Sequence, residues 1–596
     1  MTPDRLSVGD FELAPAHGRS KIMALGEAVR ALVRPGMALH LCWSNARPNA
    51  AVLELVRQFA GQDPGFTISS VGFANMQATL VAAGIVRRLI TAYAGESYPA
   101  GGVNPVFQRA IDTGAVEIEN WSQWTFVQRL MAGALGLPFL PTRSLAGSGL
   151  AEQNRGAGYA EITDPFGGGS IGAVAPLVPD IAILQGLAAD AFGNVVMSPP
   201  YGESHWGALA ARDGVIACVE RILSTDAIRS LGPLVRIPGH AVKAVCLTPF
   251  GSHPYGAFSP PQVEVPSYVE DDAFIEAAAR ACRTPDAIQA WMDEWVFALP
   301  DHDAYLAKLG PGRLADLSER AAPQRWRADL AAQAPTDVPG HTDAEAMIVI
   351  SARRIAARVR DGGFETVLAG IGASNIAAWL AEHMLTRDGT DVALVSEIGI
   401  YGYAPRPGEP FVFSNRNIAT ARQLTDVSVT LGTLVSGAHN RCLGAMGAAI
   451  IDRFGHVGST YDQKGGFIVG SGGANDIASA AAELLITVSH GRRRLVERVD
   501  HITSPGTRVR TVVTSRAVLA RDEGATPLRL VSIIAADGVA AKAAVAAARA
   551  DCGWDLEVAS DVTREPPPTA RELALIRAFD PARVFLGVLP DPSAVR

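Results

Sequence analysis

A carboxylate stands where an apolar strand pattern runs into a glycine-containing loop. Residues 391–396 read D-V-A-L-V-S and are followed by Glu397, Ile398 and Gly399. In open α/β sheets, ligands bind at the carboxyl ends of strands. A carboxylate placed there can attack a thioester carbonyl, form a mixed anhydride, and then be converted by the released thiolate into a glutamyl thioester. Gly399 permits close approach of a substrate. The alternative is that Glu397 is an ordinary helix-capping or turn residue that faces water.

A second segment, F-I-V-G-S-G-G-A-N-D at residues 467–476, predicts a strand, a glycine loop and an Ala-rich helix that runs to about Val488. Successive backbone N–H groups in such a loop can stabilise an oxyanion or hold a phosphate. The candidates for this role are Gly470, Ser471, Gly472, Gly473, Ala474 and Asn475. The segment matches neither the P-loop nor the dinucleotide fingerprint, and a tight turn without a ligand is the alternative.

Three weaker patterns accompany these two. The cluster Arg492, Arg493, Arg494 and Arg498 supplies positive charge for an anionic ligand or forms a solvated helix face. Gly95, Glu96 and Ser97 follow an apolar run, as do the glycines of G-S-G at 147–149, and each group either lines an acyl pocket or forms a plain turn. His205, His253 and His302 have no metal-like spacing to one another, so no metal site is predicted.

The elements that position these residues alternate between short β-branched runs and Ala- and Leu-rich helical patterns. Strands are expected at 37–41 and 66–71, with a helix at 49–59 between them. After a polar stretch at 321–342, the same order restarts with a helix at 344–360, a strand at 366–369 and a helix at 374–383. Two α/β domains in tandem are therefore expected, at 1–320 and 343–596, joined by a linker at 321–342.

A short internal repeat also connects the halves. D-A-F-G-N-V at 190–195 recurs as D-R-F-G-H-V at 452–457, each after an apolar segment, and both predict a strand, a glycine turn and a returning strand. A common hairpin turn would produce the same match. Together with the restarted pattern, the repeat favours two related open α/β domains.

Composition limits the function classes. With 596 residues, 48% of them hydrophobic and 19% charged, the chain is expected to be globular rather than disordered. A net charge of -8 gives no general attraction to nucleic acid or to anionic lipid. Six scattered cysteines, an N-terminus without the apolar core of a signal peptide, and no run of about 20 apolar residues favour a reduced, cytoplasmic protein without membrane spans.

Longer strings resemble a known family. In the first half they are G-L-P-F-L-P (136–141) through G-S-G-L (147–150), P-F-G-S-H-P (249–254), D-E-W-V-F (293–297) and D-H-D-A-Y-L-A-K-L-G (301–310). In the second half they are S-E-I-G (396–399), G-S-G-G-A-N (470–475) and V-D-H-I-T-S-P-G (499–506). These strings resemble, in order, the α and β subunits of glutaconate CoA-transferase, a class I CoA-transferase, here fused end to end.

The resemblance implies the class I CoA-transferase fold and a ping-pong transfer of CoA between an acyl-CoA and a small carboxylic acid, with Glu397 as the glutamate nucleophile. It implies that the loop 470–475 supplies the oxyanion and CoA contacts and that CoA is a substrate, with no metal and no redox cofactor. It places the site between the two halves, so that Gly95, Glu96 and Ser97 become candidates for contacting the acyl group. It also implies a homodimer of the fused chain.

Two departures from the family pattern keep rival functions open. Ile398 follows the nucleophile where the family commonly has a small residue, and Glu96 adds an acid where the family has small or neutral residues. A second carboxylate would repel a dicarboxylate or activate water. The alternatives are a repurposed acyl-CoA hydrolase, decarboxylase or C–C bond hydrolase, and an acyl-CoA-binding protein without turnover.

Overall fold

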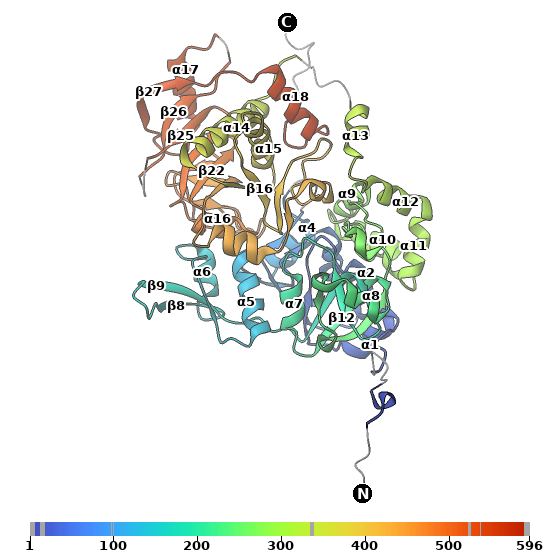
Figure 1. The fold of residues 1–596 in the computed structure, drawn as a ribbon. Helices are drawn as coiled ribbons and strands as arrows, with labels where there is room; N and C mark the ends of the chain where they lie inside the picture. Colours follow the sequence, from blue (N-terminus) through green and yellow to red (C-terminus); the bar gives the residue numbers. More distant parts are fainter. Residues whose placement is uncertain are drawn as a thin grey trace.

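The computed structural model describes residues 6–11, 18–96, 98, 101–333, 339–522, 526–536 and 538–588. Each half of the chain builds one large, mainly parallel sheet with helices packed against it, and the second half lies above the first in Figure 1. The predicted α/β class is therefore confirmed. Among the described residues, no helix has both the length and the apolar content needed to cross a membrane.

The first sheet has nine strands, in the order β13-β11-β10-β1-β2-β4-β6, with β12 beside β10 and β14 beside β12. Its strands are β1 (Ala38–Leu41), β2 (Phe66–Ser69), β4 (Val86–Thr91), β6 (Glu117–Asn120), β10 (Ile181–Ala189), β11 (Val195–Met197), β12 (Gly214–Ile222), β13 (Val235–Ile237) and β14 (Val242–Leu247). Smaller ladders are formed by β3 (Gly72–Phe73), β5 (Tyr93–Ala94), β7 (Leu140–Thr142), β8 (Tyr159–Thr163) and β9 (Ser170–Val174).

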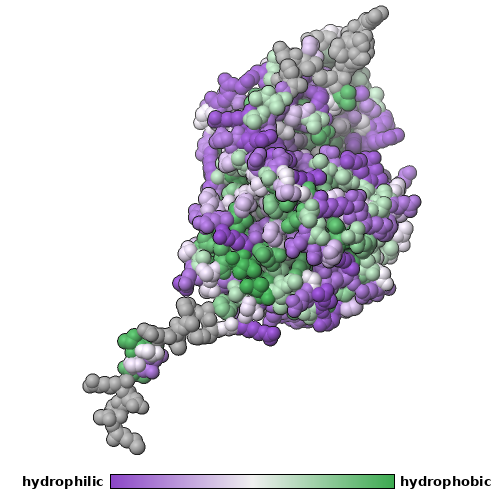
Figure 2. Space-filling model, turned by 90° about the vertical axis from the view of Figure 1, so that its right-hand side faces the viewer, coloured by the Kyte–Doolittle hydropathy of each residue, from purple (hydrophilic) through white to green (hydrophobic). Residues whose placement is uncertain are grey.

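Helices cover the first sheet and continue beyond it. They are α1 (Leu25–Leu32), α2 (Asn49–Phe59), α3 (Ala78–Ala82), α4 (Pro105–Asp112), α5 (Gln123–Leu135), α6 (Gly149–Asn154), α7 (Ser204–Ala210), α8 (Thr225–Ser230), α9 (Asp272–Ala281), α10 (Pro285–Met292), α11 (His302–Leu309), α12 (Pro311–Arg320) and α13 (Trp326–Ala332). The helix α13 lies inside the segment predicted as a linker. Figure 2 shows the face that carries α9 to α12: hydrophilic side chains cover much of it, and apolar ones gather toward its middle and lower part.

The second sheet has ten strands in the order β18-β17-β16-β15-β19-β22-β24-β25-β26-β27. They are β15 (Thr366–Ala369), β16 (Ala393–Ser396), β17 (Ile400–Tyr403), β18 (Gln423–Leu424), β19 (Cys442–Gly447), β22 (Glu483–Val488), β24 (Val509–Thr514), β25 (Ala517–Ala520), β26 (Arg529–Ile533) and β27 (Val558–Arg564). The remaining elements are β20 (Ile450–Asp452), β21 (Val457–Gly458), β23 (Leu495–Val496), α14 (Asp343–Gly362), α15 (Ala373–Arg387), α16 (Ala474–Ala480), α17 (Ala541–Ala550) and α18 (Ala570–Phe579).

The two sheets share one central arrangement. Strand β1 lies between β2 and β10, and β10 is followed by β12 and β14; in the same way β15 lies between β16 and β19, and β19 is followed by β22 and β24. Both repeated turns occupy matching places, after β10 and after β20, and each glycine takes a positive φ, +89° at Gly193 and +78° at Gly455. Two halves of related architecture follow from this match.

One predicted helix is wrong in its extent. The helix after the glycine loop was expected to reach Val488, but α16 ends at Ala480 and residues 483–488 form β22. All six residues of β22 are buried, and the strand pairs in parallel with β19 on one side and β24 on the other. The strand reads E-L-L-I-T-V and lacks the strict alternation of a half-exposed strand, so periodicity could not distinguish it from a continuing helix.

Candidate active site

Glu397 lies on the tight turn that joins β16 to the antiparallel strand β17. The Gly399 N–H donates to the Ser396 carbonyl at 3.0 Å and closes this turn. Gly399 has φ +118°, and a Cβ added there would lie 2.2 Å from the Thr425 carbonyl oxygen. Only glycine fits this position, so the residue predicted to admit a substrate serves to shape the turn.

The first half holds the same turn from the other side. The Gly202 N–H donates to the Ile398 carbonyl at 3.1 Å, and the Tyr201 N–H donates to the Thr425 carbonyl at 2.8 Å. Within the second half, the Thr430 hydroxyl donates to the Glu397 carbonyl at 2.5 Å. The backbone around Glu397 is therefore fixed by both halves, as preorganised catalysis requires.

The glycine loop 470–473 packs against both Glu397 and the first half. A Cβ at Gly470 would lie 2.0 Å from the Ala92 carbonyl oxygen, and one at Gly473 would lie 2.2 Å from Glu397 Oε2. The Gly472 N–H donates to the Ala92 carbonyl at 2.9 Å. The Gly473 N–H hydrogen bonds to the Glu397 carboxylate. Because these glycines have no side chains, the loop packs closely enough for the Gly473 N–H to reach the Glu397 carboxylate.

Asn475 and Asp476 connect the loop to the first half from below. The Asn475 Oδ1 accepts from the Leu145 N–H at 2.9 Å, while its Nδ2 donates to the Thr503 carbonyl at 2.9 Å. The Asp476 carboxylate accepts from the Ser122 hydroxyl at 2.5 Å and from the Trp124 N–H at 2.9 Å. Both side chains are fully buried, so the amide of Asn475 anchors the loop.

Burial raises the pKa of Glu397 to about 8; the nearby Asp476 carboxylate contributes to this rise and the Gly473 N–H opposes it. Burial also raises the pKa of Asp476 to about 6, against its bonds from Ser122 and Trp124. Two buried carboxyl groups that repel each other cannot both ionise easily. A carboxyl group with so high a pKa, on a cavity wall, is the kind of group found at functional sites.

A cavity of about 610 Å³ lies between the halves, and Glu397 lines it. Of the predicted site residues, Gly470, Ser471, Gly472, Gly473 and Ala474 also line it, together with Arg494 from the basic cluster. Gly399 and Asn475 are not among the lining residues, and neither are Gly95 and Glu96. Ser97 lies outside the described residues.

Glu96 lies beside this wall rather than on it. Its Oε1 accepts from the Asn104 amide at 2.6 Å, and its backbone pairs with Gly102, which does line the cavity. Burial raises the pKa of Glu96 to about 7, against the hydrogen bond from Asn104. Within the described part of the chain, its Oε2 is buried without a partner. The Glu96 carboxylate therefore holds Asn104 beside the wall.

Several wall residues come from first-half segments that sequence reasoning missed. Gln123, the first residue of α5, lies beside Gly473: its Oε1 would be 3.5 Å from a Cβ on that glycine. Trp43, Val71 and Gly72 follow β1 and β2. The one available signal was the string S-S-V-G at 69–72, which follows a strand as S-E-I-G does at 396–399.

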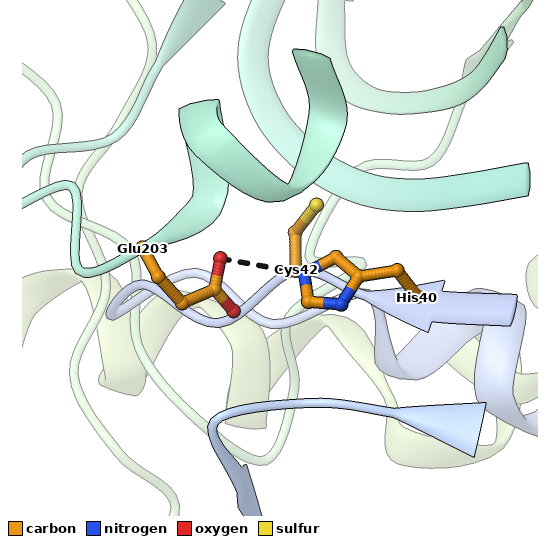
Figure 3. A group of neighbouring side chains, drawn as sticks. All are labelled: His40, Cys42 and Glu203. Carbon is orange, nitrogen blue, oxygen red and sulfur yellow. Dashed lines mark hydrogen bonds and ion pairs between the residues drawn. The ribbon is translucent and has the colours of Figure 1, made fainter. Parts of the chain in front are cut away.

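A buried polar group supports this wall from behind (Figure 3). The Glu203 carboxylate accepts from the Trp43 N–H at 2.7 Å and lies 3.4 Å from His40 Nε2. His40 Nδ1 lies 3.0 Å from the Ser69 hydroxyl, and the Cys42 thiol is 3.4 Å from the Ser204 carbonyl. Through these contacts the group connects β1, β2 and α7 and supports the wall.

The histidines His205, His253 and His302, which lack metal-like spacing, have protein partners as well. His253 lies 2.6 Å from the Tyr305 hydroxyl and 3.0 Å from Asp271, and His302 Nε2 is 2.7 Å from the Pro249 carbonyl. His205 lies 3.6 Å from Asp426. His253 and His302 therefore belong to the internal packing of the first half, whereas His205 lies beside a carboxylate of the second half.

Comparison with known proteins now identifies the family. Residues 22–247 match the family described as "Coenzyme A transferase". The chain is 30% identical, over 322 residues, to the A-type subunit of glutaconate CoA-transferase from Acidaminococcus fermentans, covering 50% of this chain and 94% of that protein. The chain belongs to the coenzyme A transferase family.

Relatives of both subunit types match this member of the family. The A-type subunit of the 3-oxoadipate CoA-transferase of Pseudomonas knackmussii is 30% identical over 298 residues, covering 49% of this chain and all of that protein. The B-type subunit of the same enzyme is 27% identical over 255 residues, covering 40% of this chain and 92% of that protein. The protein is thus an enzyme of the CoA-transferase family that unites A-like and B-like regions.

A solved structure shares the fold over nearly the whole length. The acyl-CoA transferase YdiF of Escherichia coli O157:H7, solved as a thioester complex with CoA, superposes with a TM-score of 0.63, covering 97% of this chain and all of that one. The two sequences are 16% identical. The predicted class I CoA-transferase fold of the tandem halves is therefore confirmed.

Proposed function

We propose that the protein is an acyl-CoA:carboxylate CoA-transferase in which Glu397 carries CoA as a covalent thioester. The observation that supports this most is the position of Glu397: its carboxylate lines the cavity between the halves, on a fixed turn, against the Gly473 N–H. A nucleophilic carboxylate needs this exposure to substrate together with a donor for the oxygen that becomes negative. Relatives named as CoA-transferases agree with this chemistry.

The proposed reaction has two symmetrical halves. A Glu397 carboxylate oxygen attacks the acyl-CoA carbonyl, and the C–S bond breaks to give a mixed anhydride and the CoA thiolate. The thiolate attacks the Glu397 carbonyl carbon, the acyl carboxylate leaves, and the glutamyl-CoA thioester remains. An incoming carboxylate attacks this thioester, and the same steps in reverse return CoA as a new acyl-CoA and Glu397 as the free carboxylate.

The glycine loop takes the supporting role in this proposal. The Gly473 N–H, already directed at the carboxylate, stabilises the oxyanion of each tetrahedral intermediate, and Gly470, Ser471 and Gly472 give CoA access along the wall. Gln123 adds a side-chain amide from the first half. CoA is a substrate here and no resident cofactor takes part. The A-like domain (1–320), the B-like domain (343–596) and a homodimer remain predictions.

The direct test is trapping of the thioester. Wild type and Glu397→Gln are mixed with a panel of acyl-CoAs, reduced with borohydride and analysed as intact protein and as peptides. We expect CoA addition, or its reduced product, on the peptide that carries Glu397 in wild type and none in the variant, with turnover lower by at least about 10³-fold. Glu96→Gln serves as the matched control and keeps the adduct. Release of free CoA without any adduct at Glu397 would instead establish a hydrolytic reaction.

A further inference from the structure

The charges on the cavity wall are few. Among the described residues that line the cavity, only Glu397 and Arg494 carry a formal charge. The remaining polar side chains are hydroxyls and the Gln123 amide, and the other lining groups are glycines, apolar side chains and the Trp43 indole. Glu397 is the proposed nucleophile, so one cation is left to receive any anionic part of a ligand.

Arg494 is placed at the solvent end. Its side chain is exposed, and its guanidinium donates to the Ala449 carbonyl at 2.9 Å. The neighbouring Arg492 and Arg493 are exposed too and add positive charge to the same segment. Phosphate groups are the anions that such arginines bind best. This end of the cavity therefore fits the phosphates of CoA.

Much of the rest of the wall is apolar. Val71 and Val103 from the first half and Ile371 and Phe413 from the second line it, and Ile371 lies next to Gly101 across the boundary between the halves. A carboxylate placed against these groups would lose its water without gaining a partner, which is strongly unfavourable. A hydrocarbon group would gain from burial there.

One more cation lies behind this wall, but it is screened. The Arg47 guanidinium lies 3.8 Å from the Trp43 ring centre and 3.4 Å from the Tyr255 ring centre, and Arg47 is 4% exposed. Its charge is attracted to the buried Glu270. Trp43 lines the cavity and Arg47 does not, so the indole separates this charge from the space that an acyl group would fill.

We infer that the acyl group carried by this transferase is uncharged and apolar, in contrast to the dicarboxylic acids in the names of its glutaconate and 3-oxoadipate relatives. The inference rests on the proposed function, because it assumes that the acyl-CoA occupies the cavity at Glu397. It follows from the residues that line the cavity. Arg494, at the solvent end, binds the phosphates of CoA, and the apolar part of the lining has no cation to pair with a distal carboxylate.

The test compares donors that differ in one group. Valeryl-CoA and glutaryl-CoA have acyl chains of equal carbon number. The valeryl chain ends in a methyl group, and the glutaryl chain ends in a free carboxylate. The rate of adduct formation on Glu397 is measured for both with the full wild-type chain, and benzoyl-CoA probes bulkier apolar groups. We expect valeryl-CoA to react at least about 100-fold faster than glutaryl-CoA. Equal rates, or faster reaction of glutaryl-CoA, would overturn the inference, whereas absence of adduct with all three donors would count against the proposed function.

Two variants and one control keep the inference testable at the level of single residues. Ile371→Arg places a cation on the apolar wall and is expected to lower the preference for valeryl-CoA at least tenfold, while the control Ile371→Met leaves the preference unchanged; thermal unfolding verifies that both are folded. Arg47→Met removes the screened cation and should leave the preference as in wild type. If wild type takes glutaryl-CoA and Arg47→Met abolishes that reaction, Arg47 is the carboxylate site and the inference is wrong.

Discussion

The two halves end equivalent strands with nearly the same four residues. Ser69-Ser70-Val71-Gly72 follows β2, and Ser396-Glu397-Ile398-Gly399 follows β16. Each of these strands is the parallel neighbour of a matching central strand: His40 pairs with Ser69, and Leu368 pairs with Val395, one residue before Ser396. The first half thus has a serine where the second half has its proposed nucleophile.

The path of the chain after the tetrapeptide separates the two regions. After Gly399 the chain returns at once as β17, antiparallel to β16, so Glu397 is held on a closed turn. In the first half, by contrast, the neighbour of β2 on this side is the parallel strand β4. The residues that follow Ser70, Val71 and Gly72, line the cavity. Ser70 is 3% exposed, and its N–H donates to the Ile90 carbonyl. The second half supplies the proposed reactive group at this position and the first half supplies lining residues, although both are built on the same framework.

Exchanging Glu397 and Ser70 is expected to have the largest effect on adduct formation. Glu397→Ser gives the second half the S-S-x-G pattern of the first, and we expect CoA-adduct formation to fall at least about 10³-fold because no carboxylate remains to attack. Adding Ser70→Glu to this variant should not restore the adduct, since the Gly473 N–H hydrogen bonds at position 397 and Ser70 is buried. Mass spectrometry of the trapped protein measures both, and an adduct on residue 70 would contradict the assigned division of roles.

The two glycines of the tetrapeptides should differ in their tolerance of a side chain. A Cβ at Gly399 meets backbone, 2.2 Å from the Thr425 oxygen, whereas one at Gly72 meets the ring of Trp43 at 1.8 Å. A partly exposed ring can move, but the backbone of a packed turn cannot. We expect Gly399→Ala to cost about 2–4 kcal/mol and to remove most activity, and Gly72→Ala to cost about 1–2 kcal/mol. Thermal unfolding and adduct rates of the two variants give the ranking, and an equal cost would contradict it.

Ionisation of Glu397 gives a smaller and more specific effect. The attacking form is the carboxylate and its pKa is about 8, so adduct formation should rise with pH through that value and be low at pH 6. Asp476→Asn removes the neighbouring negative charge, which lowers the pKa of Glu397 and moves the profile to lower pH. Asp226→Asn, an exposed position on α8, is the control and leaves the profile in place. A profile that does not move in Asp476→Asn would show that burial alone sets this pKa.

Local patterns were sufficient where the signal lies within one segment. The helix α2 and the strand β15 have the bounds expected at 49–59 and 366–369, because apolar periodicity and flanking turns mark them clearly. The carboxylate after β16 and the glycine loop were also readable, since each is a strand end followed by glycine. The buried strand β22 was predicted as helix because its sequence, E-L-L-I-T-V, lacks the strict alternation that marks a half-exposed strand.

Long-range packing decided the rest of the candidate site. Trp43, Val71 and Gln123 line the same cavity as Glu397 only because the two halves pack together, and no short string records that proximity. Asn475 was expected to contact substrate, yet its amide joins Leu145 to Thr503 beneath the loop. A polar residue in a glycine loop has the same sequence signature in either role, so only the surrounding hydrogen bonds distinguish them.

The repeated turn provides the mildest test of the relation between the halves. The Asp190 carboxylate accepts from the N–H groups two and four residues on, at 3.0 and 2.9 Å, and Asp452 does the same at 2.9 and 3.0 Å. Because each carboxylate satisfies at least two backbone donors, Asp190→Ala and Asp452→Ala should each cost about 1–3 kcal/mol, measured as similar shifts in thermal unfolding. Neither residue lines the cavity, so adduct rates should stay within about twofold of wild type. A large shift in only one variant would mean that the two turns share a shape without sharing a structural role.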